Sequence, residues 1–253
     1  MQIIKSKLND LFGNLEIYKE LKDLITPSLK INIEDFEGCG LEVGGPSKIF
    51  RKAIPIYPKA KKIDFANFSN STMWEGEIEN LEPVSYYKNK IGKRLISEAS
   101  ELDFPVKKTY DFIISSNCLE HVANPIKALK RWKEVLKKDR KLLLILPNKD
   151  SSFDHLRPCT TIEHLIEDFT KNIGEDDLTH LEEILKLHDL KRDKPAGTFE
   201  EFRKRSLMNQ VNRGLHHHVF NLKNINEMLE YSEFKVIENL STKIDHIFVV
   251  SNY

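Results

Sequence analysis

The chain has 253 residues, 40% of them hydrophobic, and its 39 basic side chains balance its 39 acidic ones. A chain of this length can bury a core without disulfides or a structural metal. Zero net charge argues against non-specific nucleic-acid binding and a polybasic membrane anchor, and no apolar run approaches the ~20 residues of a membrane-spanning helix. The N-terminus has no signal-peptide pattern, and Cys39, Cys118 and Cys159 have no metal-type spacing. We therefore expect a cytoplasmic protein with reduced thiols.

The N-terminal segment has the periodicity of an amphipathic helix. Apolar residues recur at three- and four-residue steps from Leu8 to Ile25, and Pro27 ends the pattern. This segment is too short to fold alone. We expect residues 1–36 to form a cover helix that packs against a single domain formed by residues 37–253.

From residue 39 onward, short apolar strands alternate with helices. The predicted strands are Cys39–Val43, Lys62–Phe65, Arg94–Ile96, Phe112–Ser115 and Leu142–Leu146. A helix is expected over residues 125–136, with proline at its first turn and one apolar face. This alternation predicts an α/β fold, in which a mostly parallel sheet has helices on both faces.

The alternation is interrupted at about residues 149–220, where we expect a helical insertion. Its predicted helices cover residues 161–169, 176–188 and 199–208. A further helix is expected over residues 221–231. The last two strands, Phe234–Glu238 and Ile247–Val250, lie close in sequence and should pair antiparallel at the sheet edge.

Two features indicate a cofactor site. The first strand runs into Gly44-Gly45-Pro46, a tight turn whose small residues allow the backbone to approach a ligand. Asp64, which we expect at the end of the second strand, can accept hydrogen bonds from both hydroxyls of a ribose. The alternative is a simple turn, with Asp64 as a helix N-cap. No third glycine follows at the spacing of a dinucleotide-binding motif, which argues against a nicotinamide cofactor.

The segments that follow extend this pattern. Glu98-Ala99, Tyr110–Ser116, Leu119–Val122 and Leu142–Pro147 occur in an order and at intervals that resemble the class I methyltransferases dependent on S-adenosylmethionine. The resemblance covers about residues 38–148 and implies a Rossmann-like fold. Two turns depart from the family pattern: Gly-Gly-Pro replaces the usual glycine-x-glycine, and Lys-Asp-Arg replaces proline-glycine-glycine before the fifth strand.

The resemblance also implies roles for individual residues. The methionine part of the cofactor would lie against Glu42, Gly44, Gly45 and Pro46. Asp64 would bind the ribose, Glu98 and Ala99 would flank the adenine, and Ser116 and Asn117 would lie beside the methyl group.

The segments that we expect on the acceptor side of the site, where the methyl acceptor would bind, contain histidines. They include the insertion at about residues 149–220. Methyl transfer is an in-line displacement, so a base is needed only if the acceptor must lose a proton. One hypothesis makes His121 that base, oriented by Glu120; the alternative is that both only shape the pocket. A second hypothesis is a divalent metal such as manganese, and its candidate ligands are Asp154, His155, His217 and His218. The alternative is that these histidines form hydrogen bonds within the pocket. His164, His180, His188 and His246 are interpreted as structural or exposed.

Several cations also fall on the acceptor side. Lys149, Arg157 and Arg213 are candidates for binding an anionic acceptor, together with His216. For any one of them, an ordinary surface ion pair is the alternative.

The second half has a narrower resemblance. Phe153-Asp154-His155, Glu163-His164-Leu165, Gly174–His180 and Leu215–Phe220 look like segments of methyltransferases from bacterial surface-polysaccharide clusters, most of all capsular enzymes thought to methylate a phosphoramidate group. This resemblance implies O-methylation of a small or nucleotide-linked sugar or phosphate acceptor. The partners would include neither nucleic acid nor membrane, and a homodimer is compatible with the hypothesis. The alternatives are an NAD(P)-dependent oxidoreductase or epimerase and a non-catalytic partner with the same fold.

Overall fold

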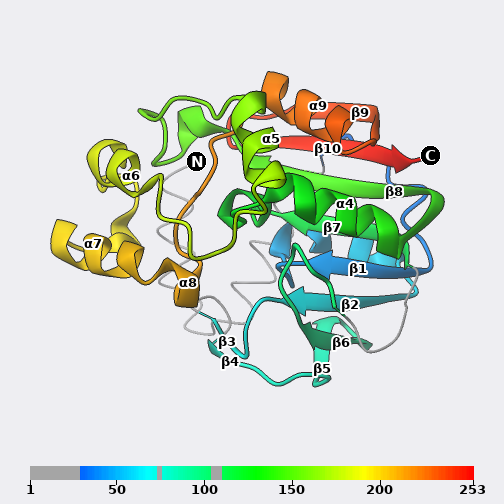
Figure 1. Ribbon diagram of the computed structural model, residues 1–253. Coiled ribbons are helices and arrows are strands. Elements are labelled where there is room, and N and C mark those ends of the chain that lie inside the picture. Colours follow the sequence, from blue (N-terminus) through cyan, green and yellow to red (C-terminus); the bar gives the residue numbers. More distant parts are fainter. Residues whose placement is uncertain (1–28, 73–75, 104–109) are drawn as a thin grey trace, which may run out of the picture.

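The computed structural model describes residues 29–72, 76–103 and 110–253. Most of the predicted cover helix lies outside these residues; the described part, 29–36, contains a turn and no helix. Eight of the described strands form one sheet, in the order β5-β6-β2-β1-β7-β8-β10-β9 (Figure 1). Its strands are β1 (Cys39–Val43), β2 (Lys62–Asn67), β5 (Pro83–Tyr87), β6 (Lys90–Ile96), β7 (Tyr110–Ser116), β8 (Leu136–Pro147), β9 (Lys235–Ser241) and β10 (Asp245–Asn252). A short hairpin, β3 (Ser71–Thr72) and β4 (Gly76–Glu77), lies apart from it.

The centre of the sheet is parallel and its edges are antiparallel. β1 pairs in parallel with β2 and β7, β6 with β2, and β8 with β7. β10 runs antiparallel to both β8 and β9, which confirms the predicted final pair. The predicted fold class is therefore confirmed: a mostly parallel, Rossmann-like sheet with an antiparallel end. The opposite edge strand, β5, pairs antiparallel with β6 and was not predicted.

Helices cover both faces of the sheet. The described helices are α3 (Ile56–Lys59), α4 (Pro125–Val135), α5 (Ile162–Thr170), α6 (Leu181–Leu187), α7 (Phe199–Leu207), α8 (Asn209–Asn212) and α9 (Leu222–Tyr231). Single 3₁₀ turns are η1 (Lys48–Arg51), η2 (Leu119–His121), η3 (Lys149–Ser151) and η4 (Lys194–Ala196). α4, α5 and α9 bury their apolar residues on one face, and η1 and α3 do so on the other. Two apolar cores result, one on each side of the sheet.

Local sequence explains where α4 begins and how it is held. The Asn124 side chain accepts a hydrogen bond from the Lys127 backbone N–H, and Pro125 occupies the first turn, where it needs no donor of its own. Trp132 is fully buried, and its Nε1 donates to the carbonyl oxygen of Ala99 at 2.8 Å. This contact anchors the loop after β6 to the helix layer.

The three predicted helices of the insertion correspond to α5, α6 and α7. α5 packs beside α4 and α9 over the sheet, whereas α6, α7 and α8 lie together beyond the carboxyl ends of the parallel strands (Figure 1). α6 begins only at Leu181, later than predicted. The reason is a turn in which both the backbone N–H and the hydroxyl of Thr179 donate to Asp177. The insertion has its own small apolar core, which includes Ile184 and Phe202.

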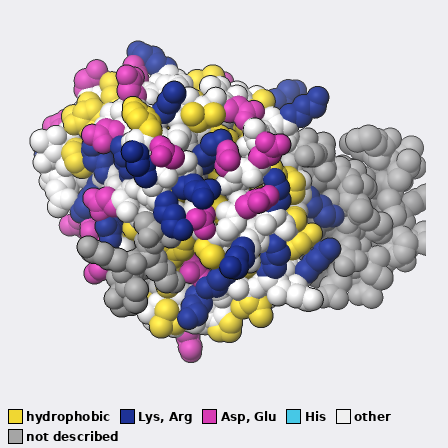
Figure 2. Space-filling model, turned by 90° about the vertical axis from the view of Figure 1, so that its right-hand side faces the viewer, with side chains coloured by type: hydrophobic (Ala, Val, Ile, Leu, Met, Phe, Trp, Pro, Cys, Tyr) yellow, Lys and Arg dark blue, Asp and Glu magenta, His cyan; other side chains and the backbone are white. Residues whose placement is uncertain are grey.

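The side of the molecule opposite the insertion carries many charged side chains. Figure 2 views the molecule from that side and shows basic and acidic side chains interspersed over it.

Within residues 29–72, 76–103 and 110–253, no helix combines the length and apolar character that a membrane crossing requires. The three cysteines are free.

Candidate functional site

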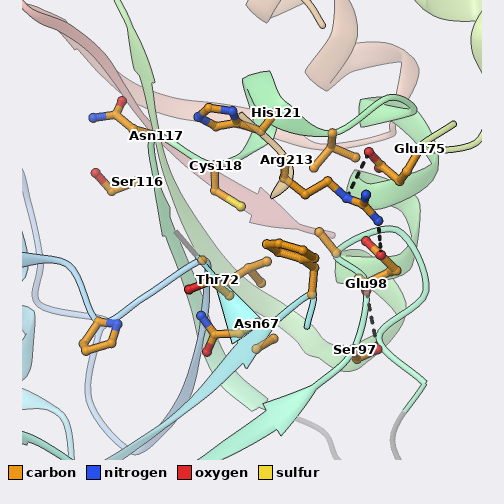
Figure 3. A pocket seen from close by; sticks show the side chains of 17 residues that line it. Asn67, Thr72, Ser97, Glu98, Ser116, Asn117, Cys118, His121, Glu175 and Arg213 are labelled. Carbon is orange, nitrogen blue, oxygen red and sulfur yellow. Dashed lines mark hydrogen bonds and ion pairs between the residues drawn. The ribbon is translucent and has the colours of Figure 1, made fainter. Parts of the chain in front are cut away.

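A cavity of about 340 Å³ opens at the carboxyl ends of β1, β2, β6 and β7 (Figure 3). Each strand end supplies part of its wall: Gly44 and Pro46 after β1, and residues 66–68, 97–99 and 116–118 from the other three. Open α/β sheets bind ligands at this edge, and ligand pockets are commonly of roughly 300–1,000 Å³. The cavity is therefore the candidate functional site.

The glycine turn after β1 is shaped by its neighbours. Gly44 has a φ of +83°, and a Cβ there would lie 2.7 Å from the Cβ and Sγ atoms of Cys118 on the cavity wall. A Cβ at Gly45 would collide with the Glu42 side chain. Both positions therefore require glycine. Gly44 and Pro46 line the cavity, as predicted, whereas Gly45 and Glu42 lie outside its lining.

Glu42 supports the turn from behind. It is fully buried, and its two carboxylate oxygens accept hydrogen bonds from the Ser47 backbone N–H at 2.8 Å and from the Tyr57 hydroxyl at 2.5 Å. Burial and the Glu42 carboxylate raise the pKa of Tyr57, so the phenol keeps its proton and donates. The predicted contact of Glu42 with the cofactor is corrected to a role in holding the turn.

Asp64 does not lie where it was predicted. β2 extends to Asn67, so Asp64 is in the middle of the strand and outside the cavity lining. Its Oδ1 accepts from the Lys93 backbone N–H at 3.0 Å and lies 2.8 Å from Lys62 Nζ. Asn67 occupies the strand end instead. Its Nδ2 donates to Gly45 O at 3.1 Å, which joins the ends of β1 and β2.

Glu98, Ala99, Ser116 and Asn117 all line the cavity, as predicted from the sequence. Their predicted contacts with the adenine and the methyl group stay predictions. Asn117 has a left-handed backbone, with a φ of 49°. Burial raises the pKa of the Asp245 carboxyl, although the Asn117 side chain opposes this shift.

Arg213 closes one side of the cavity. Its guanidinium forms an ion pair with Glu98, and its Nε lies 3.4 Å from Glu175 Oε2 (Figure 3). It also lies over the Phe68 ring, 4.9 Å from the centroid. Burial raises the pKa of Glu175 to about 7 even though Arg213 opposes the shift. Arg213 is thus at the predicted site, but two carboxylates already engage it.

His121 lines the cavity from η2. Its Nδ1 donates to the carbonyl oxygen of Leu215 at 2.9 Å, which leaves the lone pair on Nε2. Burial, reinforced by the neighbouring His216, lowers the pKa of His121 to about 3. The ring is therefore neutral at neutral pH. The Leu215 carbonyl thus holds the ring at Nδ1, and a carboxylate oxygen of Glu120 lies within 4.8 Å of a ring nitrogen of His121. The predicted orienting role of Glu120 stays a prediction.

Glu120 and His216 lie behind His121, outside the cavity lining. The His216 ring is 4.5 Å from the His121 ring, and its Nδ1 hydrogen-bonds to Asp154 Oδ2 at 2.5 Å. Burial opposes protonation of His216, but the Asp154 carboxylate outweighs it and raises the pKa of His216. Burial also raises the pKa of Glu120 to about 7. His216 therefore supports His121. Its predicted role in acceptor binding required it to face the cavity, and it does not.

Arg157 is a buried structural residue, only 1% exposed. Its guanidinium contacts four oxygens: Asp154 Oδ1 at 3.0 Å, Glu183 Oε1 at 2.8 Å, and the carbonyl oxygens of His216 and His217 at 2.8 and 3.2 Å. Lys149 Nζ donates to the carbonyl oxygen of Arg157 at 2.6 Å. Neither side chain lines the cavity, so the prediction that Lys149 and Arg157 bind the acceptor is wrong.

The predicted metal ligands do not converge. Each is bound elsewhere: Asp154 to Arg157 and His216, His155 Nε2 to Asp189 Oδ2 at 3.0 Å, His217 Nε2 to Asn209 Nδ2 at 2.9 Å, and His218 Nε2 to Ala123 O at 3.1 Å. The predicted ligand set is therefore wrong. The described residues instead gather two other groups with ligand-like atoms: Glu120, His121 and His216, and His164, Asp168, His180 and His218.

Several cavity residues had no role in the sequence analysis. Asn67, Phe68 and Glu175 are the main ones. Asn67 could have been found by extending the second strand by two residues. Glu175 lies in the Gly174–His180 segment, but neither it nor Phe68 could be placed at the cavity from the sequence, because their positions depend on tertiary contacts with Arg213.

The chain is similar to one family model and to several solved structures. A family model described as a methyltransferase domain matches residues 18–239. No curated protein matches the chain. Similar solved structures include a SAM-dependent methyltransferase from Aquifex aeolicus, with 14% identity, a TM-score of 0.42 and coverage of 93% of this chain and 89% of that one. A S-adenosylmethionine-dependent methyltransferase from Clostridium acetobutylicum ATCC 824 has 9% identity, a TM-score of 0.46 and coverage of 99% and 96%. The N-methyltransferase NodS from Bradyrhizobium japonicum WM9 has 10% identity, a TM-score of 0.40 and coverage of 85% of each chain.

The family model spans most of the chain, including every strand that contributes to the cavity. The chain therefore belongs to the methyltransferase-domain family, and it is a S-adenosylmethionine-dependent methyltransferase with a Rossmann-like fold.

Proposed function

We propose that the enzyme transfers the methyl group to an oxygen that is already negatively charged, on a phosphate or phosphoramidate group linked to a sugar. The observation that carries the proposal is the state of His121, which lines the cavity with a pKa of about 3. A general base works best when its pKa lies near the working pH. His121 is far from that value and therefore ill suited to deprotonating a sugar hydroxyl. An anionic oxygen needs no such base.

The donor side of the cavity suits the family's cofactor. S-adenosylmethionine, when bound, supplies a methyl group on a positively charged sulfur. The glycine turn fits a closely approaching ligand, because a Cβ at Gly44 would fill the gap to Cys118. On this proposal Gly44 and Pro46 contact the methionine part, Asn67 faces the ribose, and the loop at Glu98 borders the adenine. The chain's task is then to hold donor and acceptor in line.

The acceptor side contains one cation suited to an anionic group. Arg213 enters the cavity with its charge shared between Glu98 and Glu175. Because burial holds the pKa of Glu175 at about 7, this carboxylate accepts a proton readily near neutral pH. An anionic acceptor would then replace Glu175 as the partner of Arg213. A planar guanidinium binds phosphate oxygens in a bidentate manner.

The polysaccharide context of the proposal comes from the sequence. Leu215–Phe220, which resembles the capsular enzymes, carries the carbonyl that holds His121 and begins two residues after Arg213. The proposal therefore assigns the enzyme to O-methylation in capsular or surface polysaccharide biosynthesis.

Two measurements test the proposal. Calorimetry with S-adenosylhomocysteine and with NAD should show binding of the first alone; binding of NAD instead would contradict methyl transfer. Formation of S-adenosylhomocysteine is then followed with matched sugars that carry a phosphoramidate, a phosphate ester or only hydroxyls. We expect at least tenfold higher kcat/KM for the anionic acceptors. Equal or faster transfer to the neutral sugar would overturn the anionic acceptor, and donor binding without transfer to any of the three would favour a non-catalytic partner.

A further inference from the structure

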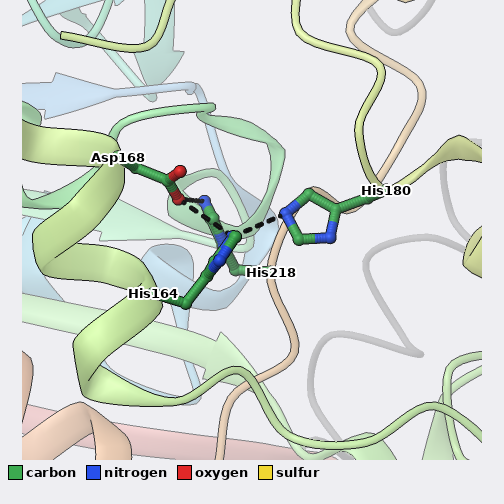
Figure 4. Close-up of side chains that lie close together, drawn as sticks. All are labelled: His164, Asp168, His180 and His218. Atoms are coloured by element: carbon green, nitrogen blue, oxygen red, sulfur yellow. Dashed lines mark hydrogen bonds and ion pairs between the residues drawn. The ribbon is translucent and has the colours of Figure 1, made fainter. Parts of the chain in front are cut away.

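A cluster of three histidines and one aspartate lies outside the cavity lining (Figure 4). His164 and Asp168 are four residues apart on α5 and so share one face of the helix. His180 comes from the loop before α6, and His218 comes from the extended segment before α9. Segments far apart in the chain thus place four metal-ligating side chains together, with one atom of each within 4.8 Å of all the others.

The dimensions of this cluster are close to those of a metal-ligand shell. His164 Nε2 lies 2.9 Å from His180 Nε2 and 3.3 Å from Asp168 Oδ2. His218 Nε2 lies 3.7 Å from the same carboxylate oxygen. Zinc bonds of about 2.0–2.1 Å in a tetrahedron hold neighbouring ligand atoms about 3.3 Å apart. Small side-chain adjustments would therefore bring the cluster around one ion.

The hydrogen bonding within the cluster is incomplete in a way that a cation would correct. Asp168 Oδ2 is buried, and no donor among the described residues hydrogen-bonds to it, although the carboxylate points at the histidines (Figure 4). Buried polar atoms are normally satisfied by hydrogen bonds. In the described part of the chain, this oxygen has only the ion-pair contacts with His164 and His218 described above, at 3.3 and 3.7 Å. The two facing nitrogens of His164 and His180 share at most one hydrogen bond, whereas both could bind a metal.

We propose that His164, Asp168, His180 and His218 bind one zinc ion. Imidazole nitrogens and a carboxylate oxygen are ligands that zinc accepts, and four protein ligands complete a tetrahedral structural site. His218 needs the largest change. Its Nε2 now donates to Ala123 O at 3.1 Å, so this bond is exchanged for the bond to zinc and the proton moves to Nδ1.

The position of the cluster suggests what the ion does. The segment between Asp168 and His180 carries Glu175, and the segment just before His218 carries Arg213. Both residues line the cavity. An ion at this site would fix both segments against α5. This role is independent of the acceptor's identity. The second group of ligand-like atoms, on Glu120, His121 and His216, belongs to the cavity side of the site described above.

The test measures zinc binding directly. The full chain, stripped with a chelator, is titrated with Zn²⁺ by calorimetry and with Co²⁺, whose absorption reports tetrahedral coordination. We expect one equivalent bound by the wild type. His180→Ala and the nearly isosteric Asp168→Asn should weaken binding at least tenfold, because loss of even a residue supporting a ligand commonly costs about 10- to 100-fold. Zinc should raise the melting temperature of the wild type more than that of Asp168→Asn.

Two controls make the result specific. His155→Ala removes a half-buried histidine that is bound to Asp189 outside the cluster, and His121→Ala removes a histidine of the second group. Both variants should bind zinc within twofold of the wild type. The proposal is overturned by the absence of stoichiometric binding, by unchanged binding in Asp168→Asn and His180→Ala, or by an equal loss in either control.

Discussion

Arg213 and Glu98 are separated by 115 residues in the chain, yet their side chains form an ion pair inside the cavity. Glu98 follows β6 and belongs to the sheet edge, whereas Arg213 belongs to the insertion. The pair therefore joins the donor side of the site to the acceptor side. Loss of Arg213 should therefore weaken use of the acceptor more than binding of the donor.

We expect Arg213→Ala to lower kcat/KM for the acceptor by roughly 10- to 100-fold, since a charge-assisted hydrogen bond contributes about 1.5–3 kcal/mol. The dissociation constant of S-adenosylhomocysteine should change by less than about threefold. Steady-state kinetics and calorimetry measure the two effects. Arg205→Ala is the control, because Arg205 pairs with Asp193 at 3.2 Å and lies outside the cavity lining. An equal loss in both variants would contradict the assignment.

A second prediction compares two residues of β2. Asn67→Ala should weaken binding of S-adenosylhomocysteine by roughly five- to tenfold, because it removes a cavity side chain and its hydrogen bond to Gly45 O. Asp64→Ala should change that affinity by less than about twofold. It should instead lower the free energy of unfolding by about 1–3 kcal/mol, since it removes the acceptor for the Lys93 N–H. Titration calorimetry and urea unfolding separate the effects. A larger loss of affinity in Asp64→Ala would restore the original prediction for Asp64.

The support of the glycine turn gives a third prediction. Tyr57→Phe leaves one oxygen of the fully buried Glu42 without its donor at 2.5 Å. We expect the free energy of unfolding to fall by about 1.5–3 kcal/mol. Denaturant unfolding measures the change. Tyr231→Phe removes a hydroxyl from an exposed tyrosine on α9 and should cost less than about 0.5 kcal/mol. Similar losses in both variants would argue against a special role for the bond to Glu42.

The fourth prediction concerns pH. Because the pKa of His121 is about 3, its ring is neutral from pH 5 to 8. His121→Gln should therefore leave the pH dependence of kcat/KM unchanged and lower its value less than about tenfold, whereas loss of a general base costs about 10²–10⁴. Glu120 and Glu175, each with a pKa of about 7, remain to titrate in this range. A limb of the pH profile that disappears in His121→Gln would contradict the prediction.

Stability should respond to the same histidine. In the unfolded chain His121 has its ordinary pKa of 6.5, so below that pH the unfolded state takes up a proton that the folded state does not. The free energy of unfolding should therefore rise with pH between about 3 and 6.5, and the contribution of His121 should be complete above 6.5. His121→Gln should make this slope shallower by up to one proton. Urea unfolding at pH 5.0 and 7.5 measures the difference.

Much of the fold could be predicted because each central strand has a strong local signal. β1 was predicted at Cys39–Val43, and the run Leu142–Leu146 is the buried core of β8. The edge strand β5 was missed because it is short and begins with a proline, and its partner β6 contains Gly92 and three basic residues. Such strands depend on their neighbours more than on their own sequence.

The site was harder to predict, for a physical reason. Residues next to a strand end, such as Gly44 and Glu98, line the cavity because the strand fixes their position. The positions of the charged residues of the insertion could not be predicted from the sequence, because only tertiary contacts decide whether a cation faces a ligand or a carbonyl oxygen. Arg157, for example, donates to the carbonyl oxygens of His216 and His217.

The buried guanidinium of Arg157 limits how this enzyme can be redesigned. It crosslinks the loop after β8, α6 and the backbone before α9 through four oxygens. A chimera that takes the acceptor-side helices of another methyltransferase must import all three segments together. Grafting one of them alone would leave the Arg157 guanidinium in the interior without some of its partner oxygens. A change of substrate in this fold should therefore require exchange of all three segments at once.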